Sequence, residues 1–179
     1  MFLDESGFGL LPLVRRTWAP AGKTPTLQHR FCHYLKISAV AALTISPGRR
    51  RLGLYLHLYP GGDITFESLD IFLRELRSHL GGPATLIWDN WSVHRSRRMR
   101  QFLDDQRWLR AEWLPPYAPE LNAVEYFWGQ TKYHGLANHA LMDLDDMEHA
   151  ITDQFIDIRS RQNLLRSFVR HTQLPFAFY

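Results

Sequence analysis

Apolar positions in the first third of the chain follow the patterns of β-strands. "MFLDES" at the start reads as a short strand that runs into acidic residues. Residues 34–45 are a mostly apolar run typical of a buried strand, and in residues 51–59 leucines alternate with Gly, Tyr and His. "PGRR" between them supplies a turn, so we predict an antiparallel hairpin over residues 34–59. Residues 7–33, rich in Gly, Pro, Thr and basic side chains, are predicted to form a loop or a loose hairpin.

The apolar spacing changes to three and four residues after Thr65, which predicts an amphipathic helix. Thr65 is a suitable N-cap, and the "GGP" of residues 81–83 ends the helix. The remaining pattern predicts a strand at 84–90, a helix at 95–106, a strand at 109–115, a helix from about 122 to 134, and two further helices near 143–158 and 160–171.

Three strands followed by alternating helices and strands indicate an α/β fold with a mixed sheet. The first strands pair antiparallel, and right-handed helical crossovers join the later, parallel ones. These rules place the "LIWD" strand beside the "MFLD" strand in the middle of the sheet, with helices on both faces. With 179 residues and no internal repeat or linker, we expect a single domain over residues 1–179.

Composition excludes several classes of protein. The hydrophobic fraction of 45% and the charged fraction of 22% are those of a globular protein. One cysteine, Cys32, excludes an internal disulfide and a cysteine-based zinc site. No apolar run has the length of a membrane span, and we see no leader, so we expect a cytoplasmic protein without a membrane partner.

Basic residues are clustered although the net charge is only +3. Such clusters suit a polyanion, because each Lys or Arg that contacts a phosphate releases counterions. Surface arginines that only maintain solubility are an equally good explanation of the charge pattern. The clusters are Arg15 and Arg16, "RRR" at 49–51, and Arg95, Arg97, Arg98 and Arg100.

Two predicted strands end in an acid, in "FLDES" and "IWDNW". Neighbouring strands lie about 4.8 Å apart, so Asp4 and Asp89 would stand close together and repel one another. A divalent cation such as Mg²⁺ relieves that repulsion, and a third acid would complete a site for two ions. The alternative is that both are ordinary acids that begin turns.

The third acid has two candidates in "LPPYAPELNAVEYFWGQTK", residues 114–132. Asn122 is a good N-cap, and Glu125 follows it at the spacing of a capping box, which gives Glu125 a purely structural explanation. The first turn of a helix also lets a carboxylate face the edge of the sheet. Glu120 precedes the helix on an irregular, proline-bounded stretch. Geometry favours Glu125 over Glu120.

Three motifs together resemble a known family. "FLDESGF", "LIWDNWSVHRS" and "LPPYAPELNAVEYFWGQTK" resemble the catalytic domain of DDE transposases of bacterial insertion sequences, in the branch related to mariner-like elements. Residues 15–25, "RRTWAPAGKTP", also resemble the segment after the first acid in that family, and the resemblance covers about residues 1–135. It implies an RNase H-like fold, two Mg²⁺ or Mn²⁺ ions, and cut-and-paste DNA strand transfer at TA targets.

Carried over by position, the catalytic and metal-binding acids are Asp4, Asp89 and Glu125. The 35 residues between Asp89 and Glu125 agree with the interval usual in the family, whereas Glu120 would leave only 30. The chain departs from the family at Ala123, where many members have proline. Proline suits the first helical position but is not required there.

The resemblance also bears on partners. Family members usually carry helix-turn-helix modules upstream, but Met1 is only three residues before the first acid. We therefore expect a catalytic domain alone, with a core over about 1–135 and C-terminal helices over about 136–179. It would be the product of a split reading frame, a truncated copy or a fragment. The implied partners are transposon ends and target DNA, a separately encoded N-terminal half, and a second copy in a homodimer on paired ends.

Several further residues are candidates for supporting roles. Asn90 and Asn122 are predicted to support the acids by hydrogen bonds that orient the carboxylates. His94 is predicted to be a cap or a satisfied hydrogen-bonding group, with orientation of an acid or contact with substrate as the alternative. Glu5 is expected on the opposite face of the strand from Asp4. The predicted DNA-binding residues are Arg15, Arg16, Lys23, Arg95, Arg97, Arg98 and Lys132.

The leading hypothesis is a metal-dependent polynucleotidyl transferase that acts in the bacterial cytoplasm on nucleoid DNA. In-line displacement at phosphorus needs positioning and charge neutralisation more than a protein nucleophile, which fits a sequence without a Ser/His or Cys/His constellation. A second hypothesis is a catalytically idle DNA-binding or assembly remnant on the same fold. A third is a repair or junction nuclease, which would share the metal chemistry.

Overall fold

The computed structural model describes residues 1–27 and 35–176, and within them five strands form one mixed sheet. The sheet order is β3-β2-β1-β4-β5. β1 pairs antiparallel with β2, which pairs antiparallel with β3, while β4 lies parallel to both β1 and β5. The strands are β1 Phe2–Gly9, β2 Lys36–Ile45, β3 Leu52–Pro60, β4 Ala84–Trp88 and β5 Leu109–Trp113. The predicted placement of the "LIWD" strand beside the "MFLD" strand is confirmed.

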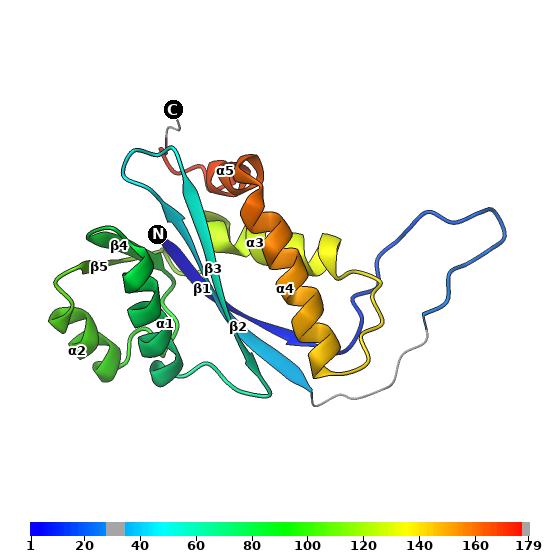
Figure 1. Ribbon diagram of the computed structural model, residues 1–179, viewed down its shortest axis with the longest axis horizontal. Helices are drawn as coiled ribbons and strands as arrows, with labels where there is room; N and C mark the ends of the chain where they lie inside the picture. The colour runs from blue at the N-terminus through cyan, green and yellow to red at the C-terminus, as the bar shows by residue number, and fades with distance from the viewer. Residues whose placement is uncertain (28–34, 177–179) are drawn as a thin grey trace.

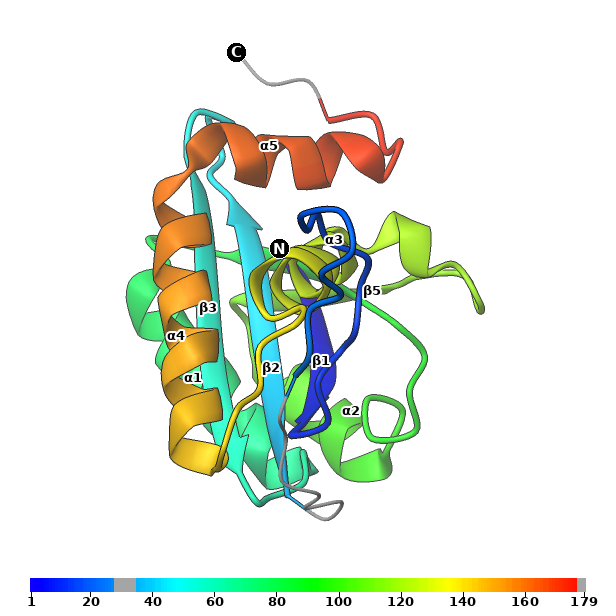
Figure 2. The same cartoon turned by 90° about the vertical axis from the view of Figure 1, so that its right-hand side faces the viewer.

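Helices cover both faces of this sheet, as predicted (Figure 1). One face carries α1 and α2, and the other carries α3, α4 and α5. The helices are α1 Phe66–His79, α2 Arg97–Asp105, α3 Ala123–Gln130, α4 Leu144–Ser160 and α5 Gln162–His171. In Figure 2, α4 runs along β3 and α5 crosses the end of the sheet, so the C-terminal helices close the face on which α3 lies.

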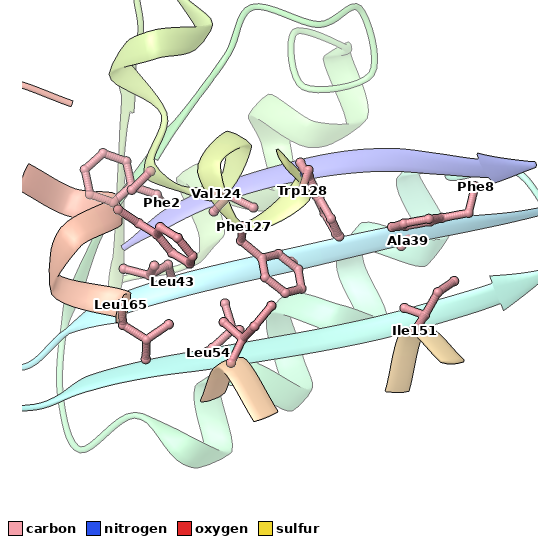
Figure 3. Close-up of a cluster of buried hydrophobic side chains, with 14 of the residues drawn as sticks. Phe2, Phe8, Ala39, Leu43, Leu54, Val124, Phe127, Trp128, Ile151 and Leu165 are labelled. Atoms are coloured by element: carbon pink, nitrogen blue, oxygen red, sulfur yellow. The ribbon is translucent and has the colours of Figure 1, made fainter. Parts of the chain in front are cut away.

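The position of β2 inside the sheet, between β3 and β1, explains the continuous apolar run in the sequence. Val40 and Ala42 face α1 and α2, whereas Ala39, Ala41 and Leu43 face α3, α4 and α5. A strand buried on both faces has no polar positions to alternate with apolar ones. Figure 3 shows side chains of α3, α4 and α5 gathered over β1, β2 and β3.

Two boundaries differ from the sequence prediction by more than two residues. β1 does not end at its acids but continues to Gly9, because the backbone ladder with β2 extends to the Gly9–Lys36 pair and Phe8 is buried. The helix predicted to reach about residue 134 ends its α-helical part at Gln130, and Thr131–Gly135 form a π-helical turn. Leu136 N–H bonds the Thr131 carbonyl there at 2.8 Å.

Local signals for α1 are confirmed. Thr65 accepts a hydrogen bond from the Ser68 N–H, and the Ser68 hydroxyl accepts one from the Thr65 N–H, which completes a capping box. Residues 10–27 form no regular element, in agreement with the predicted loop, and extend away from the sheet in Figure 1. The rest of that predicted loop, residues 28–33, and residue 34 of the predicted hairpin lie outside the described residues. No helix among the described residues is long and apolar enough to cross a membrane.

Candidate active site

The three predicted acids line one cavity of about 910 Å³. Asp4 lies in β1, Asp89 follows the last residue of β4, and Glu125 is the third residue of α3. Phe2 of β1 pairs with Ile87 of β4 across the parallel strands. Asp4 and Asp89 each follow a member of this pair by two residues. Side chains two residues apart on a strand share a face. The register of β1 and β4 therefore places these two acids together.

Asn122 holds the first turn of α3 against β1. Its side-chain oxygen accepts a hydrogen bond from Val124 N–H at 3.2 Å, and its amide nitrogen donates to the Leu3 carbonyl at 3.0 Å. Asn122 is thus the N-cap, as predicted, but its partner is Val124 and not the N–H of Glu125. The Glu125 N–H bonds the Asn122 carbonyl instead, and the Glu125 side chain lines the cavity. Glu120 does not line the cavity.

The proximity of the acids raises two of their pKa values. Burial, followed by the charges of Glu125, Glu5 and Asp89, raises the pKa of Asp4 to about 8. Burial also raises the pKa of Glu125, with a further contribution from Asp89, while Lys132 opposes the shift. Accumulated negative charge in a partly buried cavity is the situation that a bound cation relieves.

The carboxylates of Asp4, Asp89 and Glu125 have the right chemistry to bind a hard divalent cation, but their positions in the structure do not form a complete metal site. Carboxylate oxygens are the ligands that Mg²⁺ and Mn²⁺ favour. Among the residues that the structure describes, however, no three His, Cys, Asp or Glu side chains lie close enough together to hold a metal ion. The Asp89 side chain is 52% exposed and Glu125 is also exposed, so surrounding side chains leave both carboxylates space to change rotamer.

His94 joins Asp89 to a second acid. Its Nδ1 lies 2.9 Å from Oδ1 of Asp89, and its Nε2 lies 3.0 Å from Oε1 of Glu5. The ring is fully buried and stacks on Trp88 with a centroid distance of 4.1 Å. Burial lowers the pKa of His94, but hydrogen bonds to the two carboxylates and their charges outweigh it and raise the pKa to about 9. The hydrogen bond from His94 lowers the pKa of Asp89, so Asp89 stays ionised.

Two contacts to the acids were not predicted from the sequence. Trp128 packs α3 on the sheet and also donates a hydrogen bond from Nε1 to Oδ2 of Asp4 at 3.0 Å. Glu5 was expected only to face away from Asp4, and its contact with His94 was missed. The alternation of β1 sends Glu5 toward the face where His94 lies, but nothing in the sequence indicates that pairing.

Asn90 and Lys132 lie beside the same acids. Asn90 lines the cavity and donates a hydrogen bond to the Leu114 carbonyl at 2.7 Å, which holds the end of β5. Lys132 Nζ donates to the Ser6 hydroxyl at 2.6 Å and lies over the ring of Phe8. Burial lowers the pKa of Lys132, and the charges of Glu125 and Asp4 oppose that shift.

The other predicted DNA-binding residues are spread over the surface. Arg95 lines the cavity with the acids, and Arg98 pairs with Glu67. Arg97 is exposed at the first position of α2. Arg15, Arg16 and Lys23 lie in the extended loop of residues 10–27, where Arg15 donates to the Tyr133 carbonyl. The structure therefore brings Arg95 and Lys132 to the acids and leaves the other five apart from them.

Comparisons with known proteins identify a family from the sequence and a fold from the structure. The family model described as DDE superfamily endonuclease matches residues 1–148. A pre-cleavage Mos1 transpososome structure is similar with a TM-score of 0.66 and 15% identity, over 96% of this chain and 51% of that chain. The catalytic domain of Mos1 mariner transposase is similar with a TM-score of 0.58 and 12% identity, over 96% of this chain and 75% of that chain.

A retroviral complex shares the same architecture. The simian T-cell lymphotropic virus intasome is similar with a TM-score of 0.54 and 14% identity, over 88% of this chain and 46% of that chain. These likenesses confirm the predicted RNase H-like fold class. This chain spans about half the length of the transpososome chain. No curated protein sequence matches it.

Proposed function

Because the chain belongs to the DDE superfamily endonucleases, whose model matches residues 1–148, we propose that it cuts DNA and transfers the freed 3′ end to target DNA. The observation that carries the proposal is the meeting of Asp4, Asp89 and Glu125 in one cavity, from β1, β4 and α3. The raised pKa values of Asp4 and Glu125, to which burial and the charges of neighbouring acids contribute, support a cation beside these carboxylates.

The three carboxylates hold two Mg²⁺ or Mn²⁺ ions in this proposal. When bound, the ions supply activation of the attacking oxygen and neutralisation of charge on the phosphodiester. His94 keeps Asp89 ionised and oriented, and Trp128 orients Asp4. Lys132 brings a positive charge within reach of Glu125 and Asp4, where a DNA phosphate would lie. No protein nucleophile is needed, because positioning and charge neutralisation carry in-line displacement at phosphorus.

The proposed partners are transposon ends, TA target DNA and a second copy of the chain. Mos1 mariner transposase has been solved as a paired-end complex with Mn and with Mg, which supports both the choice of ion and assembly on paired ends. Those chains are about twice as long as this one. A separately encoded DNA-binding half is the corresponding proposal for recognition of the ends.

Nicking of supercoiled plasmid in Mn²⁺ tests the proposal. Asp4→Ala, Asp89→Ala and Glu125→Ala are each expected to abolish nicking while circular dichroism and thermal melting show a folded protein. Glu120→Ala is the matched control, because it removes a carboxylate five positions before Glu125 that does not line the cavity. Wild-type nicking by a purified Asp4, Asp89 or Glu125 variant would refute the role of that residue.

A catalytically idle remnant is the second candidate. It is favoured by one observation, namely that no three acidic or metal-binding side chains in residues 1–27 and 35–176 converge to hold an ion. Calorimetric titration with Mn²⁺ separates the two candidates. Binding of Mn²⁺ without plasmid nicking would identify the remnant, and binding with nicking would identify the enzyme.

A further inference from the structure

The acid-lined cavity has an aromatic side that the metal chemistry does not use. Trp91, Trp113 and Tyr117 line it together with Asp4, Asp89 and Glu125. These aromatic residues are 36%, 41% and fully exposed, respectively. About 30 Å³ of liquid volume belongs to one water molecule, so two hydrated ions fill only part of a cavity of about 910 Å³. The remaining space, next to flat apolar side chains, suits a ligand larger than a phosphate.

Tyr117 is held in a conformation that its own side chain does not explain. Its φ is +58°, in the left-handed region that costs free energy for residues other than glycine. Its ring gains nothing from packing, because the residue is fully exposed. Strained residues without a structural benefit cluster at functional sites, because the surrounding structure imposes the strain for another purpose.

The segment around Tyr117 is rigid and anchored at both ends. Leu114 N–H bonds the Trp88 carbonyl at 2.8 Å, and the Leu114 carbonyl accepts the hydrogen bond from Asn90. Pro119–Leu121 form a 3₁₀ turn on the other side, and Pro115 and Pro116 restrict φ between the anchors. In Figure 2 this yellow-green segment between β5 and α3 extends away from the sheet. Tyr117 is thus presented on a stiff support.

Trp113 continues a stack of rings that begins in the core. His94 stacks on Trp88, and Trp88 stacks on Trp113 with centroids 5.3 Å apart and an interplanar angle of 27°. Trp88 and Trp113 are also paired residues of β4 and β5. Because Trp113 is 41% exposed and lines the cavity, the stack ends at the cavity in a ring that is accessible to a ligand.

We propose that Tyr117 and Trp113 form a stacking site for one unpaired DNA nucleobase next to the phosphodiester held by the acids. The site deepens the proposed function and rests on it for the identity of the ligand as DNA. Every nucleobase has an aromatic face, so stacking accepts any base and favours nucleotides that have left the duplex. Arg95 lines the same cavity and carries a positive charge suited to the phosphate of that nucleotide.

Fluorescence of 2-aminopurine tests the site without any cleavage. The probes are a single-stranded oligonucleotide with one central 2-aminopurine and the matched duplex, each titrated with protein in EDTA. We expect the wild type to quench the single-stranded probe and to bind it more tightly than the duplex. Tyr117→Leu removes the aromatic face at similar volume, so quenching should disappear and affinity should fall about tenfold. Tyr117→Phe should behave as the wild type.

Tyr117→Gly separates stacking from a structural role. Glycine adopts positive φ without strain, so its melting temperature should equal or exceed that of the wild type while quenching is lost. Wild-type quenching by Tyr117→Leu would overturn the proposal, and so would a lower melting temperature of Tyr117→Gly.

Plasmid nicking in Mn²⁺ distinguishes failure of the stacking site from failure of the proposed function. Nicking by the wild type without quenching of 2-aminopurine would refute the stacking site alone. Selective loss of quenching in Tyr117→Leu, with no nicking by any variant, would support the stacking site and refute the nuclease.

Discussion

Nε1 of Trp128 donates a hydrogen bond to Oδ2 of Asp4 at 3.0 Å, although 124 positions separate the two residues. Both are buried where α3 packs on β1, with Trp128 in the cluster shown in Figure 3. A donor at this position favours the ionised form of a carboxyl whose pKa burial and neighbouring charges raise. The tryptophan therefore supports both the packing of α3 and the charge of Asp4.

Trp128→Phe should weaken metal binding more than it weakens the fold. Without the indole donor the pKa of Asp4 rises further, so a larger fraction of Asp4 is protonated at neutral pH. A cation then has to displace that proton in order to bind. We expect affinity for Mn²⁺ to fall by about 10–100-fold at pH 7, as for other groups that hold a metal ligand. Isothermal titration calorimetry with Mn²⁺ measures the affinity of the wild type and the variant.

Phe127→Leu is the control for that substitution. Phe127 is buried in the same cluster, but its side chain has no hydrogen-bonding group to offer an acid, so its variant should lose stability and keep its Mn²⁺ affinity. Equal losses of Mn²⁺ affinity in both variants would mean that Trp128 acts through packing alone.

The stability of the metal-free protein should fall as the pH rises toward 8. The pKa of Asp4 is about 8 in the folded protein, against an ordinary value of 3.8. The folded state therefore binds this proton more tightly, and the resulting stabilisation is complete below pH 3.8 and is lost as the pH rises through 8. Asp4→Asn lacks this dependence. Its stability relative to the wild type should rise by up to about 1.4 kcal/mol per pH unit between those limits.

Thermal melts from pH 5 to pH 8 in EDTA and in Mg²⁺ check this expectation. In EDTA the melting temperature of Asp4→Asn should overtake that of the wild type as the pH rises. Mg²⁺ should restore the wild type and have little effect on the variant, because the cation takes the place of the proton. Parallel pH curves for the two proteins in EDTA would contradict the raised pKa of Asp4.

His94→Gln should destabilise the protein most at low pH. The pKa of His94 is raised from 6.5 to about 9, so its contribution to stability is complete below pH 6.5 and is lost as the pH rises through 9. Removal of the imidazolium leaves the largely buried Glu5 without its partner, which costs about 3 kcal/mol. Chemical denaturation at pH 6 and pH 9 measures the difference.

His149→Gln is the matched control, because His149 is exposed on α4 and its Nδ1 lies 2.8 Å from the backbone carbonyl of Asp145 instead of a carboxylate. It should change stability little at either pH. A pH-independent loss in His94→Gln would show that packing against Trp88, and not charge, carries the effect.

Local patterns predicted much of the fold. The leucine alternation of β3, the apolar stripe of α1 and its Thr65 cap depend on residues close in sequence, and all three were confirmed. The π-helical turn at Thr131–Gly135 was missed, because Thr131 to His134 carry the same helical pattern as α3. The turn places Lys132 near Glu125, so the missed feature bears on the candidate site.

The sequence by itself determined the order of the elements and the placement of Asp4 and Asp89 on neighbouring strands. Strand period and crossover handedness are local or topological rules that a sequence can express. Only the tertiary structure decided which groups contact those acids, namely Trp128 on Asp4 and His94 between Asp89 and Glu5. It also brought the strained Tyr117 to the cavity that the acids line. Such contacts depend on how the helices and loops pack on the sheet. That packing is determined by side chains that are far apart in the sequence.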